Sequence, residues 1–389
     1  MIMNFDGFVA IVFIILLAAF LWRKRKHVNL QKALFPIFYV VMYRSSLGLS
    51  AMSGWAKKYP RVLKALADLG VILGFLGMVL ICVQLIYITI QSFTVTAQPG
   101  VQLVLPIDAK GVFYVPFTYW ILSIFLLAVV HEFAHGVIAR LYNIPVKSSG
   151  FAFLCILLPV VPAAFVEPDE KVLQKKSYRQ QLGVFAAGPF SNMLFALVSL
   201  ILFLLLSPVQ LAAFDTVGVE VTKITDGSPA EVLSVGDIMT EINQQQITNP
   251  GNVSAILQQF SPNESVLIKT NKELHNITLG SHPENSSQPY FGVQLKSAEE
   301  LNQEFALSYG SWTAFIVKWF NGLLFWLFML NLGIGLFNLL PLGPVDGGRM
   351  FQLVCFKLFK NKQTALLIWK YTGLFFLFII LINVFMGFF

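Results

Sequence analysis

Two histidines and a glutamate interrupt an otherwise apolar stretch, residues 126–141. His131 and His135 are four residues apart, and Glu132 follows the first of them directly. On an α-helix, positions i and i+4 lie on one face, about 40° apart, so both imidazoles can reach one metal ion. Glu132 points roughly 100° further round the helix, beside the metal and not onto it. A carboxylate in this place can take a proton from a water on the metal, which is the chemistry of metal-assisted hydrolysis.

A structural reading of the same residues is a polar contact between packed helices. Two observations weigh against it. Ionisable groups are expensive to bury in an apolar span, and the chain has only five histidines in 389 residues. The H-E-x-x-H spacing of zinc peptidases is therefore unusual by chance, and we favour a zinc site with His131 and His135 as ligands and Glu132 as the acid/base.

The composition is that of a membrane protein. The chain is 56% hydrophobic and only 12% charged, about half the charge of a soluble domain. Apolar runs long enough to cross a bilayer recur. This predicts a polytopic α-helical membrane protein with about six transmembrane helices. The spans are predicted at residues 8–22, 69–90, 117–141, 181–206, 312–330 and 365–389.

The basic residues lie mostly in short loops beside these runs. Topology thus explains the net charge of +7, and no nucleic-acid partner is expected. Residues 23–68 carry ten Lys or Arg against one acid, Asp68, which predicts a cytoplasmic loop. Both termini and residues 207–310 then face out of a cell membrane that the chain crosses several times.

Three apolar or mixed segments are too short or too irregular to be spans. Residues 33–43 are expected to lie on the membrane or dip into it. Residues 44–67 suit an interfacial helix. Residues 150–166 contain Pro159 and Pro162, and they predict a hairpin or re-entrant segment packed beside the metal site.

A different composition appears at residues 207–310, with twelve acids, four lysines and no arginine. Strand-like segments alternate with turns, which predicts a small inserted α+β domain. Its Ser228-Pro229-Ala230 and Gly236–Asn243 elements resemble the PDZ family. Backbone amides near residues 217–219 could bind a peptide C-terminus, or the domain could only exclude large ectodomains. The predicted organisation is therefore residues 1–110, 111–206, 207–310 and 311–389: a membrane region, a first half-core, the PDZ-like domain and a second half-core.

A catalytic zinc site usually needs a third protein ligand. The other histidines, His27, His275 and His282, lie in loops or in the inserted domain. Asp346 is the best candidate, because it follows a span among Pro and Gly residues on the same side of the membrane as the His pair. It could equally start the helix predicted at residues 347–359 as its N-cap. The two roles are compatible.

Three motifs carry a resemblance to a known family. They are the sequences His131-Glu132-Phe133-Ala134-His135, Gly188-Pro189-x-x-Asn192 and Asn338-Leu-Leu-Pro341-Leu-Gly-Pro344-Val-Asp346-Gly347. In order and distance they resemble the core motifs of the site-2 protease family of intramembrane zinc metalloproteases, with Val345 where the family usually has Leu. The resemblance covers residues 117–389. It implies one Zn²⁺ per chain held by His131, His135 and Asp346, with Glu132 catalytic, and it suggests Asn338 and Asn192 as groups near the substrate or oxyanion. For Asn192, a helix-packing hydrogen bond is an equal alternative.

The expected function is cleavage of transmembrane segments of membrane proteins within the lipid bilayer. Two other classes are considered. A membrane transporter would need several intramembrane acids on different spans, and few are present. A catalytically silent scaffold that presents the PDZ-like domain would tolerate a degenerate metal site, whereas every expected group is present.

Overall fold

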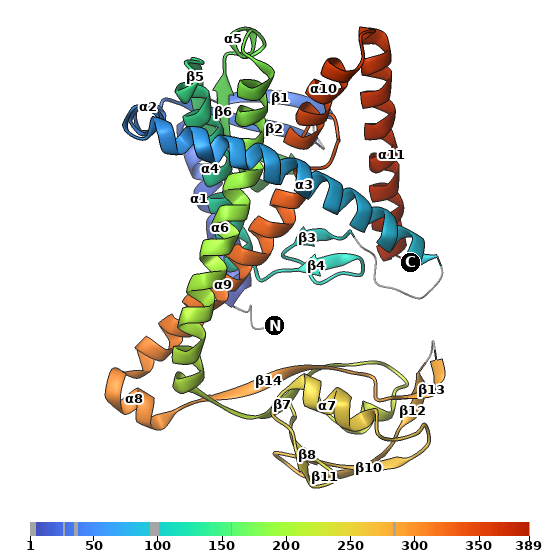
Figure 1. Cartoon of the computed structure of the whole chain (residues 1–389). Coiled ribbons are helices and arrows are strands. Elements are labelled where there is room, and N and C mark those ends of the chain that lie inside the picture. The colour runs from blue at the N-terminus through green and yellow to red at the C-terminus, as the bar shows by residue number, and fades with distance from the viewer. Residues whose placement is uncertain are drawn as a thin grey trace. The chain divides into compact units, whose positions relative to one another are not determined.

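The computed structural model describes residues 5–25, 28–34, 38–93, 101–156, 158–282 and 285–388 (Figure 1). The chain forms two compact units. The membrane unit comprises residues 1–203 and 322–389, and the inserted unit comprises residues 204–321.

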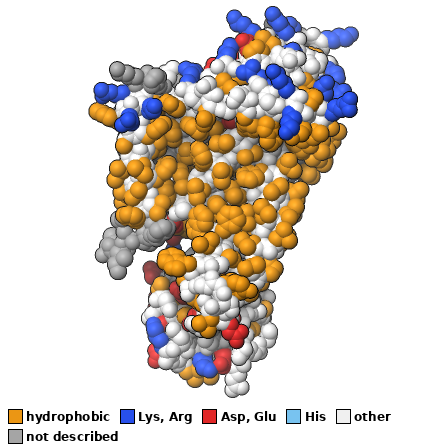
Figure 2. All heavy atoms as spheres, turned by 90° about the vertical axis from the view of Figure 1, so that its left-hand side faces the viewer, with side chains coloured by type: hydrophobic (Ala, Val, Ile, Leu, Met, Phe, Trp, Pro, Cys, Tyr) orange, Lys and Arg blue, Asp and Glu red, His pale blue; other side chains and the backbone are white. Residues whose placement is uncertain are grey.

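Six helices among the described residues are long and apolar enough to cross a membrane. They are α1 (Phe5–Arg23), α3 (Pro60–Ser92), α4 (Phe117–Leu141), α6 (Tyr178–Ala213), α9 (Ser311–Phe337) and α11 (Lys362–Phe388). Large apolar side chains such as Ile72 and Phe378 stay exposed on them, as lipid-facing residues do. Figure 2 shows hydrophobic side chains covering the side of the membrane unit, with Lys and Arg side chains gathered beyond one end of this apolar surface. The predicted polytopic architecture is confirmed.

The segment before α3 differs from the prediction of one interfacial helix over residues 44–67. The chain forms α2 (Leu49–Lys58) and then begins α3 at Pro60, so the second predicted span starts nine residues earlier than expected. Proline suits the first turn of a helix, where its missing N–H is not needed, and it cannot continue the helix that precedes it. Pro60 therefore ends one helix and starts the next.

A four-stranded antiparallel sheet lies in the membrane unit. Its strands are β1 (Val28–Leu34), β2 (Phe38–Ser45), β5 (Val146–Ile156) and β6 (Leu158–Pro168), in the order β1-β2-β5-β6. The β5–β6 pair is the hairpin predicted for residues 150–166. Residues 33–43, predicted to lie on the membrane or dip into it, form parts of strands β1 and β2, with residues 35–37 outside the described part. Their position relative to the membrane stays a prediction. Pairing with β5 satisfies the backbone of β2 in a way that an isolated apolar segment cannot.

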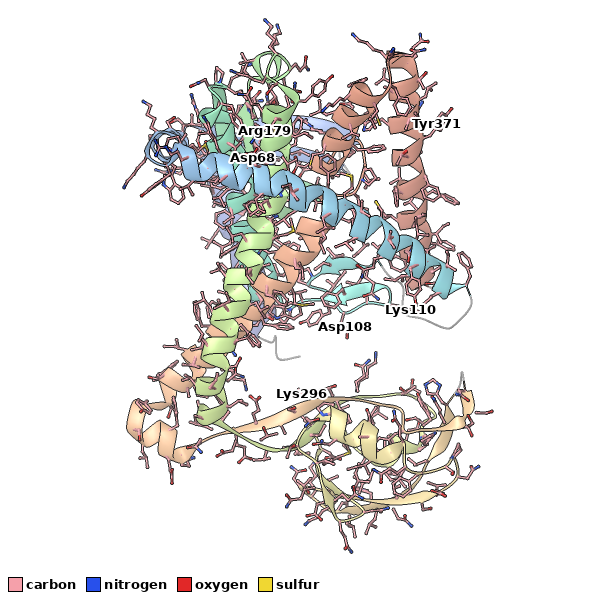
Figure 3. All side chains as sticks on the ribbon, viewed as in Figure 1. Asp68, Asp108, Lys110, Arg179, Lys296 and Tyr371 are labelled. Atoms are coloured by element: carbon pink, nitrogen blue, oxygen red, sulfur yellow. The ribbon has the colours of Figure 1, made fainter. Side chains whose placement is uncertain are left out.

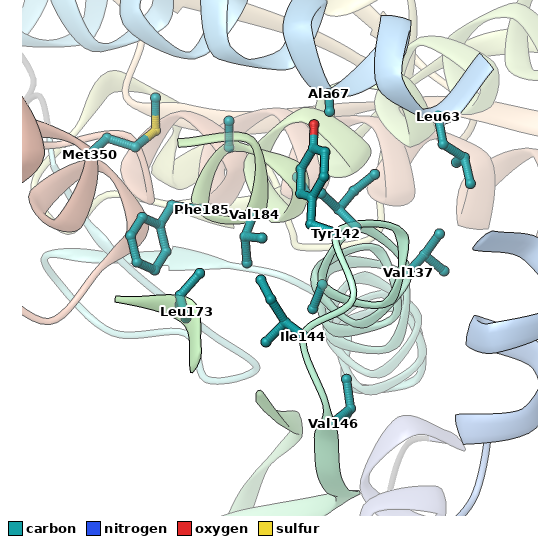
Figure 4. Close-up of a cluster of buried hydrophobic side chains, with 14 of the residues drawn as sticks. Leu63, Ala67, Val137, Tyr142, Ile144, Val146, Leu173, Val184, Phe185 and Met350 are labelled. Carbon is teal, nitrogen blue, oxygen red and sulfur yellow. The ribbon is translucent and has the colours of Figure 1, made fainter. Parts of the chain in front are cut away.

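The main core of the membrane unit joins α2, α3, α4, α6 and α10 (Asp346–Leu358). Figure 4 shows Tyr142, the C-cap of α4, beside Val184 of α6, with Phe185 next to Val184. An ion pair adds to this packing. Arg179 at the start of α6 donates to Asp68 of α3, with Nε 2.7 Å from Oδ1 (Figure 3). These contacts hold α3 and α4 against the part of α6 that carries Gly188 and Asn192. Two short parallel strands, β3 (Leu103–Leu105) and β4 (Val112–Tyr114), complete the unit.

The inserted unit is a small α+β domain. Its main sheet has the order β11-β10-β8-β7-β14, with β9 paired to β8. The strands are β7 (Phe214–Ile224), β8 (Ile238–Ile242), β9 (Gln245–Gln246), β10 (Ser265–Thr270), β11 (Leu274–Thr278) and β14 (Val293–Leu301), with a separate pair β12 (Gly280–His282) and β13 (Asn285–Tyr290). The helices are η2 (Pro229–Val232), α7 (Pro250–Leu257) and α8 (Gln303–Tyr309). Alternating apolar residues such as Val219, Val221 and Ile268 form its core.

The amides predicted to bind a peptide C-terminus lie within this sheet. Val219 pairs with Ser297 of β14 on one side and with Met239 of β8 on the other. Strand β7 therefore has no free edge at that residue, where a peptide could add. This double pairing is shown for Val219 and not for residues 217 and 218 on the β8 side. The peptide contact at residues 217–219 and the size-exclusion role of the domain both stay predictions.

A buried carboxylate in the inserted unit makes its stability sensitive to acid. Asp237 contacts the ammonium of Lys272, and its Oδ2 accepts from the Ser234 amide at 2.7 Å. Lys272 and then Ser234 hold the pKa of Asp237 below its usual range, against the opposing effect of burial. The stabilisation is therefore complete above the unfolded pKa of about 3.9 and is lost as the pH falls through the lower folded pKa.

We expect proteolysis of this unit in the full-length protein to accelerate as the pH falls below about 4. Asp237→Asn should destabilise the unit by about 1–3 kcal/mol at neutral pH and flatten that pH dependence. Asp226→Asn, at an exposed position of the same unit, is the control. An unchanged acid profile in Asp237→Asn would assign the sensitivity to other groups.

Candidate metal centre

Helix α4 brings the two predicted histidine ligands together. His131 and His135 are both buried, at 9% exposure, and their Nε2 atoms lie 3.1 Å apart. Their rings are nearly perpendicular, with centroids 4.8 Å apart. Two imidazole nitrogens thus face one point from consecutive turns of one helix.

Asp346 reaches the same point from α10. Its Oδ2 lies 3.0 Å from Nε2 of His131 and 3.2 Å from Nε2 of His135. The alternative N-cap role is not realised, because Val345 occupies the N-cap position and Asp346 is the first residue of the helix. The three potential ligand atoms lie within 4.8 Å of one another, in the one such group among the described residues.

The loop before α10 is shaped to deliver Asp346. The Gly347 N–H donates to the Asn338 carbonyl at 2.8 Å, which closes the loop on itself. A Cβ on Gly347 would lie 2.1 Å from the Leu339 carbonyl oxygen, and one on Gly348 only 1.6 Å from that of Leu342. Only glycine permits so close an approach of two backbone segments. The two glycines therefore let the start of α10 fold back against the end of the loop.

Each imidazole is also held by its second nitrogen. Nδ1 of His135 lies 2.7 Å from the Val184 carbonyl, so it donates its proton there and leaves Nε2 free as a ligand. Nδ1 of His131 lies 3.0 Å from the side-chain amide of Asn192. Asn192 is fully buried, and within the described chain its Oδ1 has no partner. If that amide turns so that Oδ1 accepts from Nδ1, His131 gains the same tautomer as His135.

Gly188 of α6 leaves the space between the imidazoles open. A Cβ built on it would lie 2.3 Å from Nε2 of His135 and 2.4 Å from Nε2 of His131. A zinc ion sits about 2.0–2.1 Å from histidine nitrogens. The distances from the position of the absent Cβ to the two nitrogens are therefore close to the distances at which a metal ion would bind both of them. With two imidazoles and one carboxylate as donors, the residues present fit a catalytic zinc ion.

Glu132 follows His131 on α4 and is not one of the three grouped ligand residues. Its Oε2 accepts from the Val166 N–H of β6 at 2.8 Å. It lines a cavity of about 110 Å³ together with residues of β5, β6 and the turn before α2. By volume the cavity has room for several water molecules, and Glu132 is the one charged side chain among its lining residues.

The two asparagines suggested for substrate or oxyanion contact have different surroundings. The side-chain amide of Asn192 lies within hydrogen-bond distance of His131, which agrees with the alternative role of a helix-packing hydrogen bond. Asn338 is half-buried, and its side chain makes no hydrogen bond to any part of the chain that the structure describes. It is therefore the freer of the two, and its contact with substrate stays a prediction.

Two groups of the site escaped the sequence reasoning. They are the carbonyl of Val184 and the amide of Val166, backbone groups that every residue carries. Gly188 was named in the motif Gly188-Pro189-x-x-Asn192, but the space that it leaves between the imidazoles was not predicted.

Comparison with known proteins identifies the family of the chain. The sequence model of peptidase family M50 matches residues 119–380, well over half of the chain. The chain therefore belongs to peptidase family M50, the site-2 protease family of membrane metalloproteases.

A relative from Methanocaldococcus jannaschii, described as an uncharacterized protein, is 28% identical over 236 residues. The match covers 60% of this chain and 56% of that relative, so the chain spans little more than half of its length. The PDZ domains of SdrC-like proteins from Listeria monocytogenes and Listeria innocua are each 24% identical, with a TM-score of 0.19. They match 21% and 20% of this chain and 90% and 92% of their own length. The family assignment rests on the M50 match.

Proposed function

We propose that the chain is an intramembrane zinc metalloprotease that hydrolyses peptide bonds in transmembrane segments of membrane proteins. One observation carries the proposal. His131, His135 and Asp346 meet at one point among apolar helices, and Glu132 lies one residue from the first ligand. The complete set argues against a silent scaffold.

The proposed roles follow from the contacts. His131 and His135 would hold zinc through Nε2, and Asp346 would hold it through a carboxylate oxygen. When bound, zinc lowers the pKa of a neighbouring water and polarises the scissile carbonyl. Asn192 and the Val184 carbonyl orient the two imidazoles.

Glu132 moves the protons. It removes one from the attacking water, whose oxygen forms the new bond to the carbonyl carbon. It then gives that proton to the amide nitrogen as the C–N bond breaks. The Val166 N–H, 2.8 Å from Oε2, fixes the direction of the carboxylate.

An edge strand beside the carboxylate suits an unwound substrate. A helical substrate hides its carbonyls in i to i+4 hydrogen bonds, so it must open before cleavage. Strand β6 is the edge of its sheet, and its Val166 N–H faces Glu132 and not β5. An extended substrate could add to this edge within reach of the site. Residues 341–344, in the loop that delivers Asp346, are the other predicted contact.

The proposed topology puts the basic end of the membrane unit in the cytoplasm. Arg140 marks that end of α4, and at 1.5 Å per residue His135 lies roughly 7 Å deeper. Loop 23–68 is then cytoplasmic, with the inserted unit and both termini outside. Accessibility labelling of cysteines introduced at Lys64 and Asp226 in intact cells tests this orientation.

Zinc content tests the ligand set. We expect Asp346→Ala, purified in detergent, to lose zinc and to cleave a model transmembrane peptide at least about 100-fold more slowly. Asp108→Ala removes an exposed carboxylate of the same unit and should retain both. Wild-type zinc content in Asp346→Ala would refute the proposed site. Full zinc with no cleavage of any transmembrane peptide by the wild type would refute the activity and leave the metal site standing.

A further inference from the structure

A large basic cavity lies apart from the metal ligands, at the Lys- and Arg-rich end of the membrane unit. It has a volume of about 920 Å³ and lies between α5 (Glu170–Leu173), the first turns of α6, helix α10 and the start of α11. Five basic side chains and one acid, Glu170, line it, for a net charge of +4. The basic residues are Lys176, Arg349, Lys357, Lys360 and Lys362.

The positive charge of this cavity is largely uncompensated. None of the four lysines forms an ion pair with any residue that the structure describes. Elsewhere lysines do find partners: Lys147 pairs with Asp169 and Lys296 with Glu220. Like charges held around one cavity repel one another. A bound anion would relieve that repulsion.

Membrane topology alone explains why lysines lie at this end of the membrane unit. It does not explain why they converge on one cavity. Lys176 precedes α6, Arg349 and Lys357 belong to α10, and Lys362 begins α11, so three separate segments supply the charge. Arg349 is already fixed, because it donates to Glu170 at 2.9 Å and lies over the Phe185 ring at 5.4 Å. A guanidinium held in place with free ammonium groups around it matches the oxygens of a phosphate.

Aromatic side chains in the cavity wall indicate which kind of anion the cavity would bind. Tyr178, Phe356, Phe359 and Trp369 line the cavity beside the lysines. Exposed apolar residues continue from it along α11, including Leu366 and Leu367. We propose that this cavity binds a phosphate-bearing anion, and that its source is the head group of an anionic phospholipid whose chains lie along α11.

The cavity borders the segment that carries Asp346. Gly343, in the loop before α10, forms part of its wall. Trp369, another wall residue, donates from Nε1 to the Gly348 carbonyl at 2.9 Å. A bound head group would therefore rest against the loop and helix that position the third ligand. The binding proposal itself does not depend on peptidase activity.

Lipid titration of the full-length protein in zwitterionic nanodiscs tests the proposal. Short-chain phosphatidylglycerol should bind wild type more tightly than phosphatidylcholine of the same chain length. The triple variant Lys357→Gln/Lys360→Gln/Lys362→Gln should weaken the phosphatidylglycerol affinity about 100-fold. Lys57→Gln/Lys58→Gln/Lys64→Gln removes the same charge at exposed positions outside the cavity and should change the affinity by less than about threefold.

Equal losses in the two triple variants, or no preference for phosphatidylglycerol, would overturn the site. A parallel titration with pyrophosphate separates the two sources of phosphate. Pyrophosphate binding that is tighter than lipid binding and lost only in the cavity variant would keep the phosphate site and overturn the lipid as its source. Because the substituted lysines are exposed, thermal unfolding and gel filtration should match wild type.

Discussion

Replacing Glu132 with Gln is expected to leave zinc bound and to reduce peptide-bond cleavage by roughly 10²–10⁴-fold or more. The side chain is not part of the proposed ligand set, and the amide of Gln can still accept from the Val166 N–H through its oxygen. The amide cannot take a proton from water at neutral pH. Binding and positioning should therefore survive while proton transfer fails, which single-turnover cleavage of a transmembrane peptide with parallel zinc analysis would measure.

A matched variant separates charge from position. Glu132→Asp keeps the carboxylate but draws it back by one methylene, away from the Val166 amide. It should recover part of the rate that Gln loses, because the base remains and only its geometry suffers. Cleavage at the wild-type rate by Glu132→Gln would remove Glu132 from the mechanism. Loss of zinc in that variant would instead make Glu132 part of the metal site.

The second large effect is expected from a single added methyl group. Gly188→Ala puts a Cβ within 2.4 Å of Nε2 of both imidazoles, and 2.6 Å from Cε1 of His131. The rings cannot turn aside freely, because Val184 and Asn192 hold their other nitrogens. We expect at least a tenfold to 100-fold loss of zinc affinity and a corresponding loss of cleavage. Competition with a zinc chelator measures the affinity.

The control for this substitution is a glycine with open space around it. A Cβ on Gly333 of α9 would meet no atom within 4 Å. Gly333→Ala should therefore bind zinc as wild type does and stabilise its helix slightly, since alanine is the better helix former. If Gly188→Ala retains zinc as tightly as Gly333→Ala, the metal position is not next to Gly188 of α6.

Local chemistry made much of this protein predictable. The six spans follow from the length and apolarity of continuous runs, because a helix satisfies its own backbone and needs no information from elsewhere in the chain. The His131–His135 pair was equally accessible, since helical periodicity alone places i and i+4 on one face. Asp346 was favoured as the third ligand only through the family resemblance. The local sequence also allowed an N-cap role, which the fold does not use.

The local sequence left the secondary structure open where the outcome depended on distant partners. Residues 33–43 fall in strands β1 and β2, which pair with each other, and β2 is also paired with β5, more than 100 residues later. Strands β8 and β14 pair with β7 at Val219 from both sides, and this pairing also depends on segments distant in the sequence. Strand pairing is non-local, so neither case could be decided from the segment itself.

By itself, the sequence determined the class of protein and the spans. It also indicated two of the proposed ligands and the proposed base, because these three residues lie on one helix. Only the tertiary structure decided what completes the site. It brought Asp346 to within 3.0 Å of His131 across 215 residues of sequence. It also supplied the Val184 carbonyl, the Val166 amide and the empty space at Gly188. Those last contributions come from backbone and from absent atoms, which acquire a role only when α4, α6 and β6 pack together.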